Sequence, residues 1–297
     1  RLQGVEQEGE KTMGKIVIVG SGPAGCSAAL YAARAGQEVV VISMGMGALS
    51  KAELIQNYYG FEEGITGAEL YRQGVAGAKA VGAEFITAEV VGLDYTGSLV
   101  VQTTEGDYPA DAVILATGTG RIAPKIAGLA EHEGRGVSYC ATCDAFFYRG
   151  KTAAVLGSGE YALHEVQALL PLAGRVILCT NGEPLTADFP EGVEICTEKL
   201  AAVEGEEKVS ALRLENGELL PVEGLFVALG VAGSAALARK LGAPVENGRI
   251  VVDEKMQTGI PGLYAAGDCT GAPYQIPAAV GEGNRAALSV VRWLRNA

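Results

Sequence analysis

The sequence predicts an α/β protein of two Rossmann-like, three-layer (ββα) domains, the second inserted into the first. Two glycine-rich loops each follow a short apolar strand and precede a helix, which is an internal repeat that implies one domain per loop. The 297-residue chain is 48% hydrophobic, enough for two cores, and its tail returns to the character of its beginning. We expect residues 14–121 and 251–297 to form the discontinuous first domain, residues 122–250 the inserted domain, and residues 1–13 a tag or disordered N-terminus.

Composition excludes several classes of function. A net charge of −12 argues against nonspecific nucleic-acid binding, which requires basic patches. No apolar run approaches the length of a membrane span, and the first twelve residues lack the apolar segment of a signal peptide. Six cysteines in a chain of this size do not suggest a secreted disulfide scaffold. We therefore expect a cytoplasmic protein that binds neither nucleic acid nor membranes.

The first nucleotide-binding pattern begins near the N-terminus. Lys15–Val19 predicts a buried parallel strand, and an alanine-rich helix runs to about Arg34. The G-x-G-x-x-G between them is the dinucleotide fingerprint in its required context, with a helix N-terminus placed for a pyrophosphate. The second strand, Glu38–Ile42, ends at Ser43, so the acid that often binds a ribose there is absent. The loop residues are Gly20, Ser21, Gly22, Pro23, Ala24 and Gly25.

The rest of the first half is less regular. Asn57–Phe61 is a loop of polar and aromatic residues, which either lines a bound ring system or forms a surface turn with packed aromatics. Residues 84–104 predict strands. Asp111–Leu115 predicts another buried strand, and the small residues Ala116, Thr117 and Gly118 after it let the backbone close over a nucleotide.

A pair of cysteines lies between the two glycine-rich patterns. Cys140 and Cys143 are spaced for a reversible disulfide, in which only the thiolate form attacks, and Asp144 is in reach to exchange a proton with them. A zinc site normally needs four ligands, and the other cysteines and the two histidines, His132 and His164, are isolated, so we expect no metal. Two buried, inert thiols are the remaining alternative, because buried cysteine is common.

The second pattern repeats the first. Thr152–Leu156 predicts a strand, Gly157–Ala162 a phosphate loop followed by a helix to about Leu170, and Arg175–Cys179 the next strand. Residues 193–220 predict antiparallel strands, with a hairpin turn at Glu215–Glu218.

The tail carries a strand, an acid and a helix. Leu263–Asp268 predicts a strand that ends in an acid, which either accepts hydrogen bonds from a ribityl or ribose hydroxyl or caps a turn. Gln275 to Ala279 leads into a helix from about Gly281 to Leu294, whose N-terminus presents the positive end of a dipole.

These motifs resemble those of low-molecular-weight thioredoxin reductases in their order along the chain. The similarity covers residues 14–297 and rests on Gly20–Gly25, Ala116–Gly118, Gly136–Asp144 and Ala265–Asp268. It implies an FAD-binding domain in two pieces, an inserted NAD(P)-binding-like domain that rotates, and a homodimer.

The resemblance also assigns roles to residues. It implies that Cys143 faces the flavin, that Cys140 attacks the disulfide of thioredoxin, and that Asp144 is the acid and base. The implied FAD contacts are Gly20, Ser21, Gly22, Pro23, Ala24, Gly25, Ser43, Asn57, Val90, Ala116, Thr117, Gly118, Asp268, Gln275 and Ile276.

The sequence departs from the NADPH-dependent members of that family. Their His-Arg-Arg run, whose arginines pair with a 2′-phosphate, is replaced by Cys179–Pro184, and no basic residue lies between Arg175 and Lys199. A bulky Tyr161 stands in the second loop, and Tyr274 replaces an expected arginine. The Gly-Gly-Gln-Leu expected before Asn57 reads Met-Gly-Ala-Leu at 46–49, so a polar flavin contact is lost. With these departures the sequence resembles the ferredoxin-dependent flavin thioredoxin reductases of anaerobic bacteria. We therefore expect electrons to pass from ferredoxin to thioredoxin.

Three other functions stay open. Gly157, Gly159 and Ala162 are retained and favour a thioredoxin reductase that uses NADH or NADPH. A dithiol oxidase that uses oxygen and a non-enzymatic flavin sensor are further alternatives. For ferredoxin docking we expect a basic patch near the cysteines, made of Arg121, Lys125, Arg135, Arg149 and Lys151.

Overall fold

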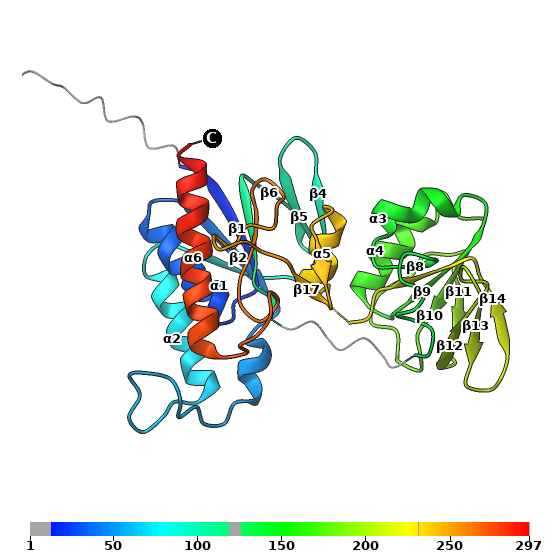
Figure 1. Ribbon diagram of the computed structural model, residues 1–297, viewed down its shortest axis with the longest axis horizontal. Helices are drawn as coiled ribbons and strands as arrows, with labels where there is room; N and C mark the ends of the chain where they lie inside the picture. Colours follow the sequence, from blue (N-terminus) through cyan, green and yellow to red (C-terminus); the bar gives the residue numbers. More distant parts are fainter. Residues whose placement is uncertain (1–12, 119–125, 231, 297) are drawn as a thin grey trace, which may run out of the picture.

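The computed structural model describes residues 13–118, 126–230 and 232–296. The chain forms two lobes that lie side by side, with the C-terminus in the first (Figure 1). The expected tag or disordered segment falls mostly on residues 1–12, which lie outside the described residues. Both lobes are built from a parallel sheet with helices and a small antiparallel sheet, so the expected pair of three-layer α/β domains is confirmed.

The first lobe is built around a five-stranded sheet in which every neighbouring pair is parallel. A parallel sheet is covered on both faces, and its central strands are accordingly apolar and buried. In spatial order its strands are β18 (Leu263–Ala265), β7 (Ala112–Leu115), β1 (Lys15–Val19), β2 (Glu38–Ser43) and β3 (Glu84–Thr87).

Helices and a second sheet cover this parallel sheet. The helix α1 (Pro23–Arg34) packs between α2 (Gly67–Lys79) and α6 (Ile276–Leu294), as Figure 1 shows. The helix α6 begins about five residues before the predicted start, because Pro277 fits the first turn of a helix. The antiparallel sheet consists of β4 (Val90–Tyr95), β5 (Leu99–Thr103) and β6 (Gly106–Ala110), and η1 (Gly47–Lys51) is a short 3₁₀ turn.

The second lobe repeats this plan. Its parallel sheet has the order β11 (Glu194–Cys196), β10 (Arg175–Cys179), β9 (Thr152–Leu156), β15 (Gly224–Val227) and β8 (Val137–Ser138). The strand β11 pairs in parallel with β10, so antiparallel pairing begins only after it, later than residue 193. The remaining elements are α3 (Ala141–Asp144), η2 (Ala145–Tyr148), α4 (Glu160–Leu169), β12 (Leu200–Glu204), β13 (Ala211–Leu214) and β14 (Leu219–Pro221).

The chain returns to the first lobe through a short helix, α5 (Ser234–Lys240), and the hairpin of β16 (Val245–Glu246) and β17 (Arg249–Ile250). The helix α5 packs on β4, and the Ile250 N–H donates to the Cys269 carbonyl of the first lobe. These contacts place α5 and the hairpin against the first lobe, and the boundary at residue 250 stays a prediction.

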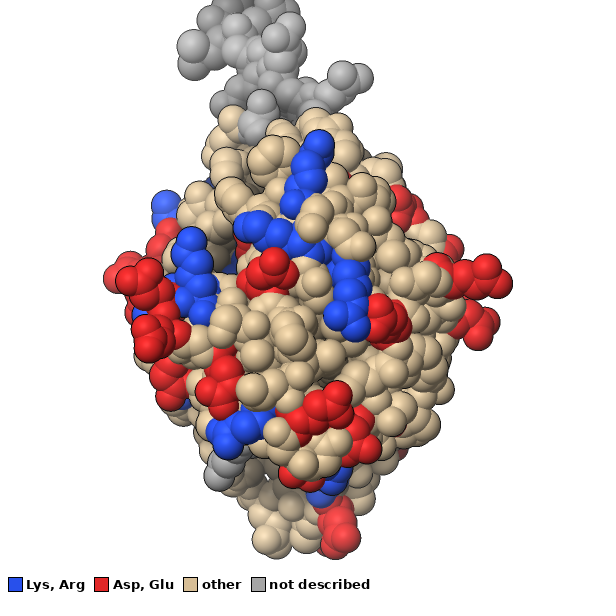
Figure 2. Space-filling model, turned by 90° about the vertical axis from the view of Figure 1, so that its right-hand side faces the viewer, with Lys and Arg blue, Asp and Glu red and all other residues tan. Residues whose placement is uncertain are grey.

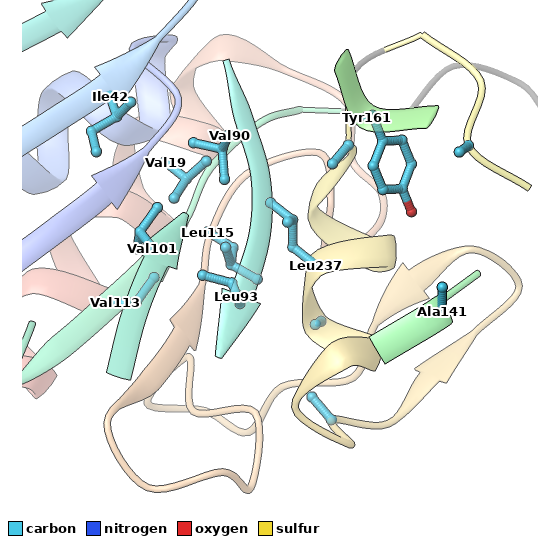
Figure 3. Close-up of a cluster of buried hydrophobic side chains, with 14 of the residues drawn as sticks. Val19, Ile42, Val90, Leu93, Val101, Val113, Leu115, Ala141, Tyr161 and Leu237 are labelled. Atoms are coloured by element: carbon cyan, nitrogen blue, oxygen red, sulfur yellow. The ribbon is translucent and has the colours of Figure 1, made fainter. Parts of the chain in front are cut away.

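One hydrophobic core cluster continues from the first lobe into the second. Leu93 on β4, Leu237 on α5 and Tyr161 on α4 all belong to it, and each is at least 98% buried. Figure 3 shows Leu237 directed toward β4, with Tyr161 and Ala141 on the side of the second lobe. The two lobes therefore meet through packed side chains, with α5 lying between them.

Candidate functional site

A cleft of about 830 Å³ opens at the carboxyl ends of β1, β2, β7 and β18. Ligands of open α/β sheets bind at this edge, and the volume suits a cofactor. The cleft brings together the expected cofactor residues except Gly25 and Asn57. Those that line it are Gly20, Ser21, Gly22, Pro23, Ala24, Ser43, Val90, Ala116, Thr117, Gly118, Asp268, Gln275 and Ile276.

Each of the three glycines of the first loop is required for a different structural reason. A Cβ on Gly20 would lie 2.4 Å from the Ala116 carbonyl oxygen, and its φ of +108° disfavours any other residue. A Cβ on Gly25 would lie 1.9 Å from the Gly20 carbonyl oxygen, so this glycine allows α1 to pack on the loop without lining the cleft. A Cβ on Gly22 would meet no atom within 4 Å, which leaves a cradle for a phosphate group.

Polar groups stand at the other end of the cleft. Burial raises the pKa of Asp268, and the nearby Glu282 carboxylate raises it further. Glu282 itself accepts hydrogen bonds from the Gly267 N–H and the Thr270 hydroxyl. Asn57 lies outside the cleft lining but donates to the Gln275 side chain at 3.1 Å, so it orients a residue that does line the cleft.

Part of the cleft comes from a segment that sequence reasoning did not single out. Ala232 and Gly233 line it just before α5. Ser234, at the start of α5, is 2.7 Å from the Thr117 hydroxyl and accepts from the Thr117 N–H. Such contacts join residues 117 positions apart and have no local sequence pattern. Tyr274 also lines the cleft. The guanidinium carbon of Arg249 lies over the Tyr274 ring, 5.4 Å from the ring centroid.

The dithiol begins the helix α3 in the second lobe. Cys140 and Cys143 form a disulfide with a Cα–Cα distance of 5.3 Å. Cys140 is the N-cap of α3 and 4% exposed, whereas Cys143 is exposed. The Asp144 carboxylate accepts a hydrogen bond from the Ser138 hydroxyl at 2.7 Å, which fixes it beside the disulfide.

The disulfide stands outside the cofactor cleft. The lining includes no residue between 126 and 230 among the described ones. Cys143 Sγ instead lies 3.6 Å from the Lys240 carbonyl oxygen, at the far end of α5. The two redox centres that the sequence predicts are therefore on different lobes and separated by α5 in this arrangement.

The second glycine-rich loop is covered by its own chain. The Thr186 N–H donates to the Ser158 carbonyl at 2.8 Å, and the Thr186 hydroxyl lies 3.0 Å from the position of a Cβ on Gly159. Tyr161 does not project into this loop: it is 2% exposed, and its hydroxyl donates to the Tyr139 carbonyl. The loop thus keeps the nucleotide-binding fold while residues after β10 lie against its glycines.

The described residues hold neither a metal-binding cluster nor a membrane-spanning helix. In the described ranges, no group of three or more His, Cys, Asp or Glu side chains is arranged to hold a metal ion. None of the helices in the described part of the chain is long and apolar enough to cross a membrane.

Comparison with known proteins is consistent with this geometry. Residues 14–283 match the model of the pyridine nucleotide-disulphide oxidoreductase family. A thioredoxin reductase of Aquifex aeolicus is 35% identical, over 94% of this chain and 93% of its own length. The crystal structure of the atypical thioredoxin reductase TRi from Desulfovibrio vulgaris Hildenborough is 38% identical with a TM-score of 0.89, covering 96% of this chain and 99% of that chain. A ferredoxin-flavin thioredoxin reductase from Clostridium acetobutylicum is 36% identical with a TM-score of 0.73, covering 96% and 99%.

The chain belongs to the pyridine nucleotide-disulphide oxidoreductase family. Within that family it is similar to thioredoxin reductases, which are FAD-binding flavoproteins, and FAD is its cofactor. The cleft fits FAD: Gly22 leaves a cradle at the helix N-terminus for the pyrophosphate, and Asp268 stands partly desolvated where a hydroxyl would bond.

Proposed function

We propose that the protein reduces thioredoxin with electrons from reduced ferredoxin, by way of FAD and the Cys140–Cys143 disulfide. The observation that carries the choice of donor is the second glycine-rich loop. Thr186 lies against Gly159, where a nucleotide phosphate would approach the backbone. No basic residue lies between Arg175 and Lys199 to pair with a 2′-phosphate. Both features disfavour a pyridine nucleotide as donor.

The dithiol passes two electrons and two protons to thioredoxin in each cycle. The Cys140–Cys143 disulfide takes up two electrons and two protons and opens to two thiols. The Cys140 thiolate then attacks the disulfide of thioredoxin and forms a mixed disulfide, and the Cys143 thiolate displaces thioredoxin as a dithiol. FAD, when bound, accepts electrons from the donor and supplies them to the disulfide.

Asp144 is suited to handle the protons of this cycle. Its carboxylate adjoins Cys143 in sequence and is held by the Ser138 hydroxyl, which also accepts a hydrogen bond from the Cys140 N–H. In our proposal Asp144 protonates the departing sulfur when the disulfide opens and takes the proton back when it closes.

The energetics favour a ferredoxin donor. An iron–sulfur protein near roughly −400 mV can reduce a thioredoxin couple near roughly −270 mV. The difference of roughly 130 mV corresponds to about 6 kcal/mol for two electrons. The C. acetobutylicum relative carries ferredoxin in its name, which supports the same choice.

The exposed surface beside the disulfide suits a protein partner. Phe146 and Phe147 are each 66% exposed, and large exposed aromatics mark interaction sites. Arg149 lies 5.3 Å from the Phe146 ring centroid. We propose that thioredoxin docks on this surface next to Cys143.

Two of the five residues expected to form a basic patch for ferredoxin, Arg121 and Lys125, lie outside the described residues. The three other basic members are matched by the acidic residues Glu131, Glu133 and Asp144, so the described part carries no net excess. Figure 2 shows basic side chains gathered in the upper half of the end face of the second lobe, with acidic ones around them. The docking site of ferredoxin stays a prediction, to be tested by charge reversal at Arg149 and Lys151 and the salt dependence of the rate.

A pyridine-nucleotide donor is the second candidate, because Gly157, Gly159 and Ala162 keep the loop itself. Anaerobic mixing distinguishes the two. The oxidised protein is mixed separately with NADPH, NADH and chemically reduced ferredoxin, each with thioredoxin present and with Cys143→Ser as the control. We expect only ferredoxin to bleach the flavin and yield reduced thioredoxin. Bleaching by either nucleotide at catalytic speed would establish the second candidate instead.

The quaternary structure is part of the proposal. The resemblance implies a homodimer, and light scattering of the purified protein tests it: a mass near 61 kDa is expected, since one chain has 30.5 kDa and two have 2 × 30.5 = 61 kDa.

A further inference from the structure

The segment around Cys140 is held from two sides. On the α4 side, the Tyr161 hydroxyl donates to the Tyr139 carbonyl at 3.0 Å, and the Glu165 carboxylate accepts from the Ala141 N–H at 2.5 Å. Residues 161 and 165 are four apart and therefore lie on one face of the helix. These bonds fix the backbone immediately before and after Cys140.

On the other side, two cations of α5 reach into the second lobe. Lys240 Nζ is 2.5 Å from Glu165 Oε1, and both side chains are 1% exposed. Arg239 pairs with Glu133 at 2.9 Å, and its guanidinium carbon lies 4.7 Å from the centroid of the Tyr139 ring. The last turn of α5 thus contacts the same segment that α4 holds.

The charges of this contact are complementary. Burial would raise the pKa of Glu165, but the hydrogen bond from His164, the charge and hydrogen bond of Lys240, and the Ala141 N–H together lower it. Glu165 therefore stays ionised opposite Lys240. A buried ion pair contributes little net stability against an apolar pair, but it specifies one geometry, because a buried charge without its partner is costly.

The helix α5 joins this contact to the cofactor cleft. Its first residue, Ser234, hydrogen-bonds Thr117 in the cleft lining, and its last, Lys240, pairs with Glu165 beneath the dithiol. The helix packs on β4 of the first lobe and so moves with the cleft. A rotation of the second lobe that carries the disulfide toward the cleft must break the Lys240–Glu165 pair, because the two residues lie on opposite sides of the lobe boundary.

We infer that Glu165 and Lys240 are positioning residues that hold the dithiol at the end of α5, away from the flavin cleft. Opening this pair is then a step in every catalytic cycle. The inference requires the disulfide and the cleft, not the identity of the electron donor.

The test compares two double variants. In E165Q/K240M, glutamine keeps an acceptor for the Ala141 N–H, so only the link between the lobes is removed, and the neutral pair avoids an unpaired buried charge. The matched control is R175M/E194Q, which removes an exposed ion pair within the second lobe. K240R, which keeps the charge, should behave as the unchanged protein.

Two readouts follow for each variant with FAD bound. Small-angle X-ray scattering reports the arrangement of the lobes without any electron donor. Anaerobic turnover with dithionite as reductant reports kcat and KM for thioredoxin. For E165Q/K240M we expect a mixture of arrangements in scattering and a kcat raised about tenfold, equivalent to about 1.4 kcal/mol. KM should be unchanged, because the surface of Phe146 and Phe147 is intact.

Unchanged scattering and unchanged kcat in E165Q/K240M would overturn the inference, as would the same changes in R175M/E194Q. If E165Q/K240M does not fold, E165Q/K240Q serves in its place, since it removes the same buried charge pair and leaves amide groups that can hydrogen-bond at both positions. The same comparison then applies, with a smaller shift expected. Failure of ferredoxin as donor would leave both readouts intact.

Discussion

The glycines of the first loop allow a prediction that differs from one glycine to the next, because their surroundings differ. In G25A the new Cβ would lie 1.9 Å from the Gly20 carbonyl oxygen, whereas real Cβ contacts stay beyond 3.0 Å. The loop or α1 must therefore shift by at least 3.0 − 1.9 = 1.1 Å. Gly20 itself stands close to Ala116, since a Cβ built on it would lie 2.4 Å from the Ala116 carbonyl oxygen.

Overpacking of this kind lowers the free energy of unfolding by about 3 kcal/mol. At roughly 2–4 °C per kcal/mol, G25A should unfold roughly 6–12 °C below the unchanged protein. It should also lose FAD, because the displaced loop lines the cleft. Thermal unfolding followed by circular dichroism, and the ratio of flavin to protein absorbance after gel filtration, measure the two effects.

Two further glycines serve as controls. A Cβ on Gly22 meets nothing within 4 Å, so G22A should fold normally without cofactor and bind FAD more weakly, because the methyl group enters the phosphate cradle. Gly281 lies exposed in α6 with open space around it, so G281A should stabilise the helix by about 0.5–1 kcal/mol. If G25A and G281A changed stability equally, the argument from close approach would be refuted.

Three other predictions concern the second lobe. K240M should cost about 3–5 kcal/mol in denaturant unfolding, because it strands the buried charge of Glu165, and E165Q/K240M should recover most of this. Since the pKa of Glu165 is lowered from 4.5, the stability that its ionised form contributes to the unchanged protein should be fully present above about pH 4.5 and be lost as the pH falls through the folded-state pKa. Cys196 should be alkylated by iodoacetamide with a midpoint at a pKa of about 6, lowered by a hydrogen bond from the neighbouring cysteine on β10; a midpoint near 8.5 would contradict the pairing. F146A/F147A should raise the thioredoxin KM several-fold and leave kcat nearly unchanged, and an unchanged KM would move the docking site elsewhere.

The elements that the sequence predicts well are those whose cause is local. The strand Lys15–Val19 and the helix Pro23–Arg34 lie where the pattern places them, because a buried apolar run and a glycine turn each restrict the backbone within a few residues. The three-residue strand β11 has no readable period, and its parallel pairing with β10 depends on the sheet. The sequence does not predict the helix α5, because contacts with β4 fix its seven residues.

The same distinction explains the candidate site. The cofactor residues cluster because carboxyl ends of parallel strands meet at one edge, a consequence of topology that the motifs already imply. Glu165 and Lys240 are 75 positions apart, and a charged residue in sequence ordinarily indicates an exposed surface. Their burial becomes visible only when the lobes are placed against each other.

The two glycine-rich loops share one sequence pattern but differ in what lies against their glycines. Both follow a buried strand and begin a helix, and in both the glycines permit close approach of another group to the backbone. In the first loop the space at Gly22 is open toward the cleft, whereas in the second the Thr186 hydroxyl lies 3.0 Å from where a Gly159 Cβ would be. The glycines of the second loop also serve close packing within the lobe: a Cβ on Gly157 would lie 2.2 Å from the Ala228 carbonyl oxygen after β15 and 2.8 Å from the Ala162 Cβ on α4. These packing roles are reason enough for the fold to retain the glycines, and in our proposal the segment after β10 decides whether a nucleotide can bind there.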